Sequence, residues 1–300
     1  MEETSSAIHR RRDACRVCGD RSLRRFLSLG PMPLANAFLR CPDEFAEEPA
    51  YSLDVYFCQT CSLVQLTDVI DPEVLFRDYI YVTGTSDTIA EHNIQYARAL
   101  VDNLKLGAED LVIEVASNDG SLLKCFQRHG VKALGIEPAT NIAEKARSNG
   151  IETINEFFNS TTARKVRESY GPAKLVIGNN VLAHVDEPKD FLRGCRELLA
   201  EDGRVVIEVP YLRDLLERLE YDTIYHEHFS YLSFTIVERV FAAQGLTLFD
   251  VDEVSTHGGS LRIYGRHAED TAKHVTASVT ALKQREADWG VDSLRPYQAF

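Results

Sequence analysis

The sequence predicts an α/β protein with a doubly wound, mostly parallel sheet, preceded by a small metal-binding module. Short apolar runs alternate with helical stretches through the middle of the chain, which is typical of a parallel sheet covered by helices. Two Cys-x-x-Cys pairs stand ahead of that alternation. With 300 residues, of which 44% are hydrophobic, the chain is long enough for one large core and a second, smaller domain.

The two cysteine pairs are Cys15 with Cys18 and Cys58 with Cys61. Four thiolates at this spacing suit tetrahedral zinc without an open position, so we expect a structural metal. The alternative is four free cysteines in a core. An alternating run over 51–57 predicts a strand that leads into the second pair. The remaining cysteines are expected to be buried thiols: Cys41, Cys125 and Cys195.

The elements of the larger domain follow from their periodicity. Strands are expected over 111–115, 133–137, 174–180 and 204–209, and helices over 87–104, 121–129 and 141–148. Apolar runs at 245–251 and 260–264 flank a Gly-Gly turn and predict an antiparallel pair that completes the sheet. An amphipathic helix is expected from 267. We therefore divide the chain into a zinc-binding domain (1–70), a cofactor-binding domain (71–266) and a C-terminal helix (267–300).

Charge and hydropathy narrow the class of function. The formal net charge of -13 repels a phosphate backbone, which argues against a nucleic-acid substrate. The N-terminal residues contain no apolar core of a secretory signal, and no stretch approaches the ~20 apolar residues of a membrane span. We expect a cytoplasmic protein without a membrane partner; the sequence does not indicate its oligomeric state.

The loop after the first expected strand, Glu114 to Ser121, predicts a cofactor site. It joins a strand to a helix N-terminus at the sheet edge where α/β proteins bind ligands. Asn118, Asp119 and Gly120 offer backbone amides and side-chain oxygens, and Glu137 at the end of the second strand suits ribose hydroxyls. The loop lacks G-x-G-x-x-G, which favours a nucleoside cofactor without a pyrophosphate. The alternative is an ordinary turn beside a surface glutamate.

Histidines gather at two later points. Tyr225-His226-Glu227-His228 could supply general acid–base groups, metal ligands or simply a solvated loop. His184 follows the strand that ends at Asn179, on the same edge as the cofactor loop, and taken alone it suits a structural histidine as well as a catalyst.

These motifs, in this order, resemble the zinc-containing sugar C-methyltransferases that make branched deoxysugars of the tetronitrose and mycarose type. The resemblance covers nearly the whole chain. It rests on the cysteine pairs, 33–38 (PLANAF), 117–120 (SNDG), 135–138 (GIEP), 180–185 (NVLAHV), 224–228 (IYHEH) and 256–262 (THGGSLR).

The resemblance implies a class I methyltransferase fold that binds S-adenosylmethionine, and a nucleotide-linked keto-deoxysugar methylated next to its ketone. It implies that His228 removes the α-proton, that Tyr225 and Glu227 orient the sugar, and that His184 stabilises the enolate oxygen. Tyr79 would reach the cofactor carboxylate. The implied cofactor set is Tyr79, Glu114, Ser117, Asn118, Asp119, Gly120, Glu137, Pro138, Asn179 and Asn180.

Two features depart from the family pattern. Ala116 stands where the family has glycine, which predicts a backbone slightly farther from the cofactor. Family members carry a further C-terminal α/β domain, so we expect 267–300 to be the start of such a domain. The alternatives are a methyltransferase acting on another small molecule or on RNA, and a non-catalytic protein that binds S-adenosylmethionine.

Overall fold

The computed structural model describes residues 8–85 and 87–300, and its centre is a seven-stranded sheet. The strand order is β12-β13-β10-β9-β6-β7-β8. Five strands are parallel: β6 (Leu111–Val115), β7 (Lys132–Ile136), β8 (Thr153–Ile154), β9 (Ala173–Asn179) and β10 (Leu199–Pro210). The antiparallel strands β12 (Leu246–Val254) and β13 (Ser260–His267) complete one edge. The predicted fold class, with its antiparallel last strands, is confirmed.

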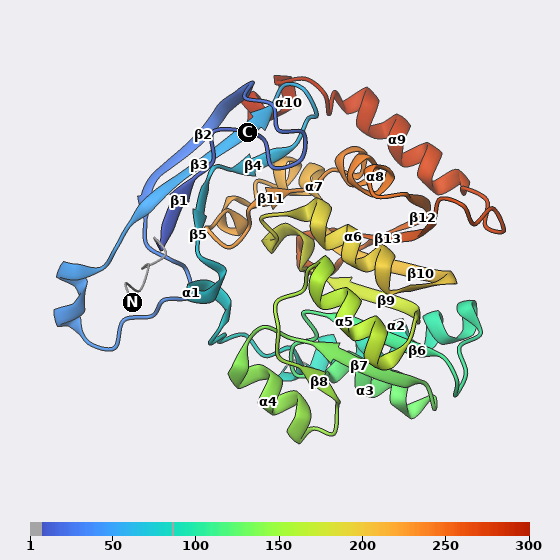
Figure 1. The fold of residues 1–300 in the computed structure, drawn as a ribbon. Coiled ribbons are helices and arrows are strands. Elements are labelled where there is room, and N and C mark those ends of the chain that lie inside the picture. Colours follow the sequence, from blue (N-terminus) through green and yellow to red (C-terminus); the bar gives the residue numbers. More distant parts are fainter. Residues whose placement is uncertain (1–7, 86) are drawn as a thin grey trace.

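Helices cover both faces of this sheet (Figure 1). Val112 of β6 faces a core shared with α2 (Asp87–Leu104) and α3 (Ser121–Arg128), whereas Ile113 faces one shared with helices that come after residue 159. This alternation is what a strand buried on both sides requires, and it explains the unbroken apolar runs. The other covering helices are α4 (Thr140–Ser148), α5 (Ser160–Tyr170), α6 (Pro188–Leu198) and α8 (Phe234–Ala243).

The N-terminal module contains two smaller sheets. One pairs β1 (His9–Arg11) with β5 (Asp68–Ile70). The other has the order β11-β4-β3-β2 and is built from β2 (Leu23–Met32), β3 (Tyr51–Cys58), β4 (Val64–Leu66) and β11 (Ser230–Tyr231). A 3-10 helix spans Pro42–Glu47. Because β11 comes directly after the histidine motif, the cysteine-bearing sheet and that motif form one continuous structure.

The remaining elements include two short helices and the C-terminal segment. The short helices are α1 (Pro72–Phe76) and α7 (Leu212–Glu217). Instead of one helix from 267, β13 runs to His267 and is followed by α9 (Ala277–Trp289) and α10 (Arg295–Ala299). Glu286 of α9 is fully buried and accepts hydrogen bonds from the backbone amides of Phe234 and Thr235 at 2.7 and 2.8 Å. It therefore caps the N-terminus of α8.

The C-terminus returns to the N-terminal module, as the neighbouring blue strands and red helix α10 in Figure 1 show. Tyr297 is buried against Phe57 and Phe26, with ring centroids 4.8 and 5.5 Å apart. Of the three unpaired cysteines, Cys125 and Cys195 are buried as expected. The expectation for Cys41 is wrong: it is exposed, because it precedes the 3-10 helix Pro42–Glu47, none of whose residues is buried.

Candidate active site

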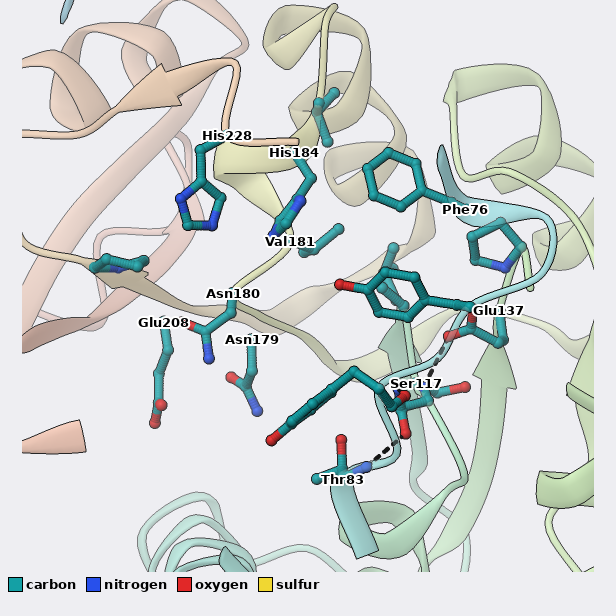
Figure 2. A pocket seen from close by; sticks show the side chains of 18 of the residues that line it. Phe76, Thr83, Ser117, Glu137, Asn179, Asn180, Val181, His184, Glu208 and His228 are labelled. Atoms are coloured by element: carbon teal, nitrogen blue, oxygen red, sulfur yellow. Dashed lines mark hydrogen bonds between the residues drawn. The ribbon is translucent and has the colours of Figure 1, made fainter. Parts of the chain in front are cut away.

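A cavity of about 1190 Å³ lies at the carboxyl ends of the parallel strands. Figure 2 shows His184 and His228 together on one side, Ser117 and Glu137 on another, and Asn179 and Asn180 between them. The chain order of the strands reverses between β6 and β9, and this switch point is where open α/β sheets bind ligands. The cavity is large enough for a nucleoside-sized ligand together with a second molecule.

The loop between β6 and α3 is a tight turn that brings its backbone against the cavity. Ala116, Asn118 and Gly120 have φ values of +54°, +50° and +74°. Ala116 thus adopts a conformation that favours glycine, at a cost of about 1–2 kcal/mol. Gly120 is required for space as well, because a Cβ there would lie 2.7 Å from Cγ1 of Ile151.

Glu137 closes one side of this loop. Its two carboxylate oxygens accept hydrogen bonds from the backbone amides of Asn118 and Ala139 at 2.8 and 2.9 Å. Burial raises the pKa of Glu137, although these amide bonds act in the opposite direction. Each carboxylate oxygen keeps a second lone pair, so the side chain can also accept from a diol that enters the cavity.

Among the buried polar atoms at the cavity that have no hydrogen-bond partner within the described part of the chain, four belong to residues that the sequence predicted for the site. They are Oε2 of Glu114, Oγ of Ser117, Oδ1 of Asn180 and Nδ1 of His184. Burial, followed by the charge of Glu137, raises the pKa of Glu114 well above its ordinary value. Buried polar groups of this kind are normally paired, so they mark where a ligand's polar atoms belong.

The charged side chains that line the cavity are acidic, and four of them are paired with arginines that do not line it: Glu73, Asp186, Glu187 and Glu208. Nine carboxylic side chains line it, and no Lys or Arg does among the described residues: Asp71, Glu73, Glu114, Glu137, Asp186, Glu187, Glu208, Glu220 and Asp222. S-adenosylmethionine carries a sulfonium and an ammonium group, and its ribose suits Glu137. The donor set therefore fits the expected cofactor.

His228 is held in one tautomer. Its Nδ1 lies 2.8 Å from the carbonyl oxygen of Thr223 and must donate to it, which leaves the lone pair of the neutral ring on Nε2. The hydroxyl of Tyr225 lies 3.0 Å from that Nε2. Burial raises the pKa of Tyr225, so the phenol stays protonated and donates to the ring. His228 thus presents a basic nitrogen, covered by one phenol, to the cavity.

His184 lies beside His228, with ring centroids 4.7 Å apart. Burial, and then the neighbouring His228, lower the pKa of His184 well below its ordinary value. The His184 ring is therefore neutral at pH 7. Phe76 packs edge-on against it at 5.6 Å and fixes its orientation.

Glu227 and Tyr79 contact each other. The carboxylate of Glu227 accepts from Nδ2 of Asn36 at 2.6 Å and from the hydroxyl of Tyr79 at 3.2 Å. Burial raises the pKa of Glu227, which is only 2% exposed and is not one of the cavity-lining residues. Tyr79 does line the cavity. Glu227 therefore reaches the site through Tyr79, which differs from direct contact with a sugar.

The side chains of Asn118 and Asp119, two of the expected cofactor residues, bind the neighbouring loop at 81–84 and are not free to bind a ligand in the cavity. Oδ1 of Asn118 accepts from the amide of Thr83 at 2.8 Å, and Oδ2 of Asp119 accepts from the amide of Gly84 at 3.2 Å. Asp119 and Gly120 are not among the lining residues, whereas Pro138, Asn179 and Asn180 are. The loop at 81–84 is thereby fixed over the cofactor loop.

Sequence reasoning missed several residues at the site. Asn36 lies in the quoted 33–38 motif, which could have indicated a role. Arg262 lies in the 256–262 motif and bonds to Glu208 at 2.6 Å, while its guanidinium stacks 3.7 Å from the ring centroid of Tyr96. No local pattern pointed to Thr223, because only its backbone carbonyl contacts His228.

The four cysteines of the N-terminal pairs converge. Their sulfur atoms all lie within 4.8 Å of one another, with Cys15 and Cys61 3.5 Å apart and Cys18 and Cys58 also 3.5 Å apart. The neighbouring Cys61 thiol lowers the pKa of Cys15 to about 4. Four sulfurs at these separations fit tetrahedral zinc with bonds of about 2.3 Å and no open position, which makes the site structural.

Comparisons with known proteins agree with this architecture. Residues 15–76 match the family model of a zinc binding domain, residues 89–251 a methyltransferase domain, and residues 255–300 a C-methyltransferase C-terminal domain. The curated protein C-methyltransferase NovU of Streptomyces niveus is 36% identical over 289 residues, which span 96% of this chain and 68% of the relative.

The fold also matches a solved structure, the PH0226 protein of Pyrococcus horikoshii OT3. Its TM-score is 0.50 with 18% identity, covering 66% of this chain and 96% of the other. Within the described residues, no helix has the length and apolarity needed to cross a bilayer. The chain belongs to the zinc-binding, S-adenosylmethionine-dependent C-methyltransferases.

Proposed function

We propose that this C-methyltransferase acts on a nucleotide-linked keto-deoxysugar and methylates the carbon next to its ketone through an enolate. The observation that carries the proposal is the His228–Tyr225 pair, which faces the same cavity as the cofactor loop. A carbon next to a ketone is a weak acid, so its methylation needs a base effective near neutral pH and a donor for the developing oxyanion.

The base is Nε2 of His228. Its lone pair is fixed by the Nδ1 bond to Thr223, and it becomes available when the substrate displaces the Tyr225 hydroxyl. The displaced phenol, still protonated, then donates to the substrate oxygen and orients the sugar. His184, neutral and adjacent, takes part in stabilising the enolate oxygen, and Glu227 holds the Tyr79 hydroxyl until the cofactor binds.

The cofactor residues have a matching arrangement. Glu137 holds the ribose, and the Glu114 to Gly120 loop surrounds the methionine portion. Bound S-adenosylmethionine supplies the electrophilic methyl group. Ser117 and Asn180 offer their unpartnered oxygens to it, and Pro138 and Asn179 complete the lining. Tyr79 reaches the cofactor carboxylate only by turning its hydroxyl away from Glu227.

Zinc lies outside this chemistry. Held by four thiolates, it cross-links the two cysteine knuckles and stabilises the N-terminal module. We place the reaction in the cytoplasm, where thiols stay reduced and available to the metal. The divisions at 70 and 266 then separate a structural module, a catalytic domain and a C-terminal segment that packs on both.

The test is incubation of zinc-loaded protein with isotopically methyl-labelled S-adenosylmethionine and a panel of nucleotide-linked keto-deoxysugars. We expect one sugar to gain a labelled methyl group on carbon, located by mass spectrometry and NMR. His228→Asn should abolish transfer while cofactor binding, measured by calorimetry, is retained.

Transfer to RNA, or to the corresponding sugars that lack a ketone, would contradict the proposal. Failure of S-adenosylmethionine to bind would also contradict it and would favour a non-catalytic protein.

A further inference from the structure

We propose that Arg16, the residue after Cys15 in the first knuckle, is a positioning residue that ties the zinc module to both histidine-bearing segments. The histidine roles rest on the proposed function, but the contacts of Arg16 stand apart from it. Arg16 is 2% exposed as a residue, and its side chain is completely buried. A buried guanidinium is retained only where partners satisfy it, so its contacts identify what it holds.

The guanidinium joins three partners that lie in two segments, strand β4 and the stretch after the 3-10 turn Leu182–His184. Nη1 lies 3.1 Å from a carboxylate oxygen of Asp186, Nη2 donates to the carbonyl of Leu66 at 2.5 Å, and Nε donates to Gln65 at 3.3 Å. The backbone amide of Arg16 also donates to Gln65, at 3.1 Å. The knuckle is therefore fastened to β4 by both the main chain and the side chain of one residue.

Asp186 links this contact to His184. It lies two residues after His184, immediately beyond the 3-10 turn Leu182–His184. Besides Arg16 it receives Nη1 of Arg12 at 2.9 Å and Nη2 of Arg10. Three arginines of the N-terminal module thus converge on one carboxylate of the catalytic domain, and they fix the segment that carries His184.

The same guanidinium contacts the His228 segment from the other side. Its carbon lies 5.3 Å from the ring centroid of Phe229, the residue after His228. The carbonyl of Phe229 accepts from the amide of Leu66 at 3.0 Å, and Ser230 pairs with Gln65 in the β11–β4 ladder. Both histidines are therefore one or two residues from a group that Arg16 contacts.

Only arginine can make this connection. Its planar fork presents donors in fixed directions to several acceptors at once, whereas the lysine ammonium is a point charge that cannot reach all three. Displacement of a catalytic group by about 1 Å can cost about a hundredfold in rate. We therefore expect loss of the fork to disturb the paired histidine rings even where the metal stays bound.

The experiment uses zinc-loaded full-length protein with isotopically labelled histidine. Arg16→Lys removes the guanidinium, and Asp186→Asn removes the charge of the carboxylate that the guanidinium binds. The second change leaves the sequence of the zinc module unaltered. Arg21→Met is the matched control, because Arg21 belongs to the same module but is 78% exposed and pairs only with the exposed Asp13 among described carboxylates. Zinc content is measured by elemental analysis, cofactor affinity by calorimetry, and the ring environments of His184 and His228 by NMR.

We expect both test variants to keep zinc and to bind S-adenosylmethionine within about twofold of the parent. Their His184 and His228 ring signals should shift and broaden together, and kcat should fall by about tenfold or more. The effect of the double variant should be smaller than the sum of the two single effects, because the Arg16–Asp186 contact is lost in both single variants. Arg21→Met should leave the signals unchanged.

Ring signals that stay in place in Asp186→Asn would overturn the proposal, as would equal shifts in Arg21→Met. Should Arg16→Lys lose its zinc, Asp186→Asn decides alone, since it leaves the knuckles intact. The NMR readout needs no sugar substrate. An unexpected substrate would therefore refute the proposed function and leave this inference standing.

Discussion

Replacing Glu137 by Gln separates cofactor recognition from fold stability. The parent carboxylate accepts two backbone amides at 2.8 and 2.9 Å and, in our proposal, two ribose hydroxyls. A hydrogen bond to a charged group contributes about 1.5–3 kcal/mol. Gln keeps one acceptor oxygen, so at least one charged bond is lost, and the affinity for S-adenosylmethionine should fall roughly 10- to 150-fold.

The same change should affect stability little. The amide NH2 of Gln must face one backbone N–H, which costs about 1–3 kcal/mol. Against this, burial raises the pKa of Glu137, so a neutral side chain avoids the cost of a buried charge. The two effects oppose each other, and the free energy of unfolding should change by about 1 kcal/mol or less.

Calorimetric titration of zinc-loaded protein with S-adenosylmethionine measures the affinity, and urea unfolding measures the stability. Glu156→Gln is the control, since Glu156 is exposed two residues beyond β8. The parent's affinity should also fall on acidification, as a raised pKa brings protonation of Glu137 at a higher pH than for an exposed glutamate. An unchanged affinity in a folded Glu137→Gln variant would refute the ribose assignment.

Three further variants test the loop, the buried ring and the metal. Gly120 and Gly130 both have positive φ, but only at Gly120 would an alanine Cβ press against Ile151. Urea unfolding should therefore show that Gly120→Ala loses about 1–3 kcal/mol more unfolding free energy than Gly130→Ala does. Equal losses would contradict the steric argument. Because the folded pKa of His184 is lowered, its contribution to stability is present above about pH 6.5 and is lost as the pH falls. The parent should therefore lose unfolding free energy between about pH 7.5 and 5.5, and His184→Gln should remove up to about 1.4 kcal/mol of that loss, measured by thermal unfolding at both values. An unaltered pH dependence would contradict burial of a neutral ring. Cys58→Ser should lower the zinc content, measured by elemental analysis, and the melting temperature, measured by calorimetry. Cys41→Ser, at an exposed cysteine, should change neither. Full zinc occupancy in Cys58→Ser would contradict the four-thiolate site.

The strands of the central sheet could be predicted from the sequence because each one is marked by a local run of apolar residues. The runs at Leu111–Val115 and at 204–209 are apolar on both faces, and each is followed or preceded by a helical period. The sequence alone also predicted that the four cysteines share a metal site, because metal ligation constrains their spacing.

Long-range contacts lay beyond that reasoning. The strand β11 has only two residues, and it exists because Ser230 and Tyr231 pair with β4, about 165 residues earlier in the chain. Glu227 resembled a sugar ligand, but its contacts with Asn36 and Tyr79 are decided by how the two domains pack. Local motifs thus identify which residues gather at the site, whereas their partners follow from tertiary structure.

The most direct test of the account is proton exchange at the carbon next to the ketone. With S-adenosylhomocysteine in place of the methyl donor, wild-type protein in D2O should exchange that hydrogen of its keto-sugar substrate, because the base acts without methyl transfer. His228→Asn should bind S-adenosylmethionine normally and show no exchange by NMR. Exchange at the wild-type rate in His228→Asn would show that another group is the base and would contradict the mechanism.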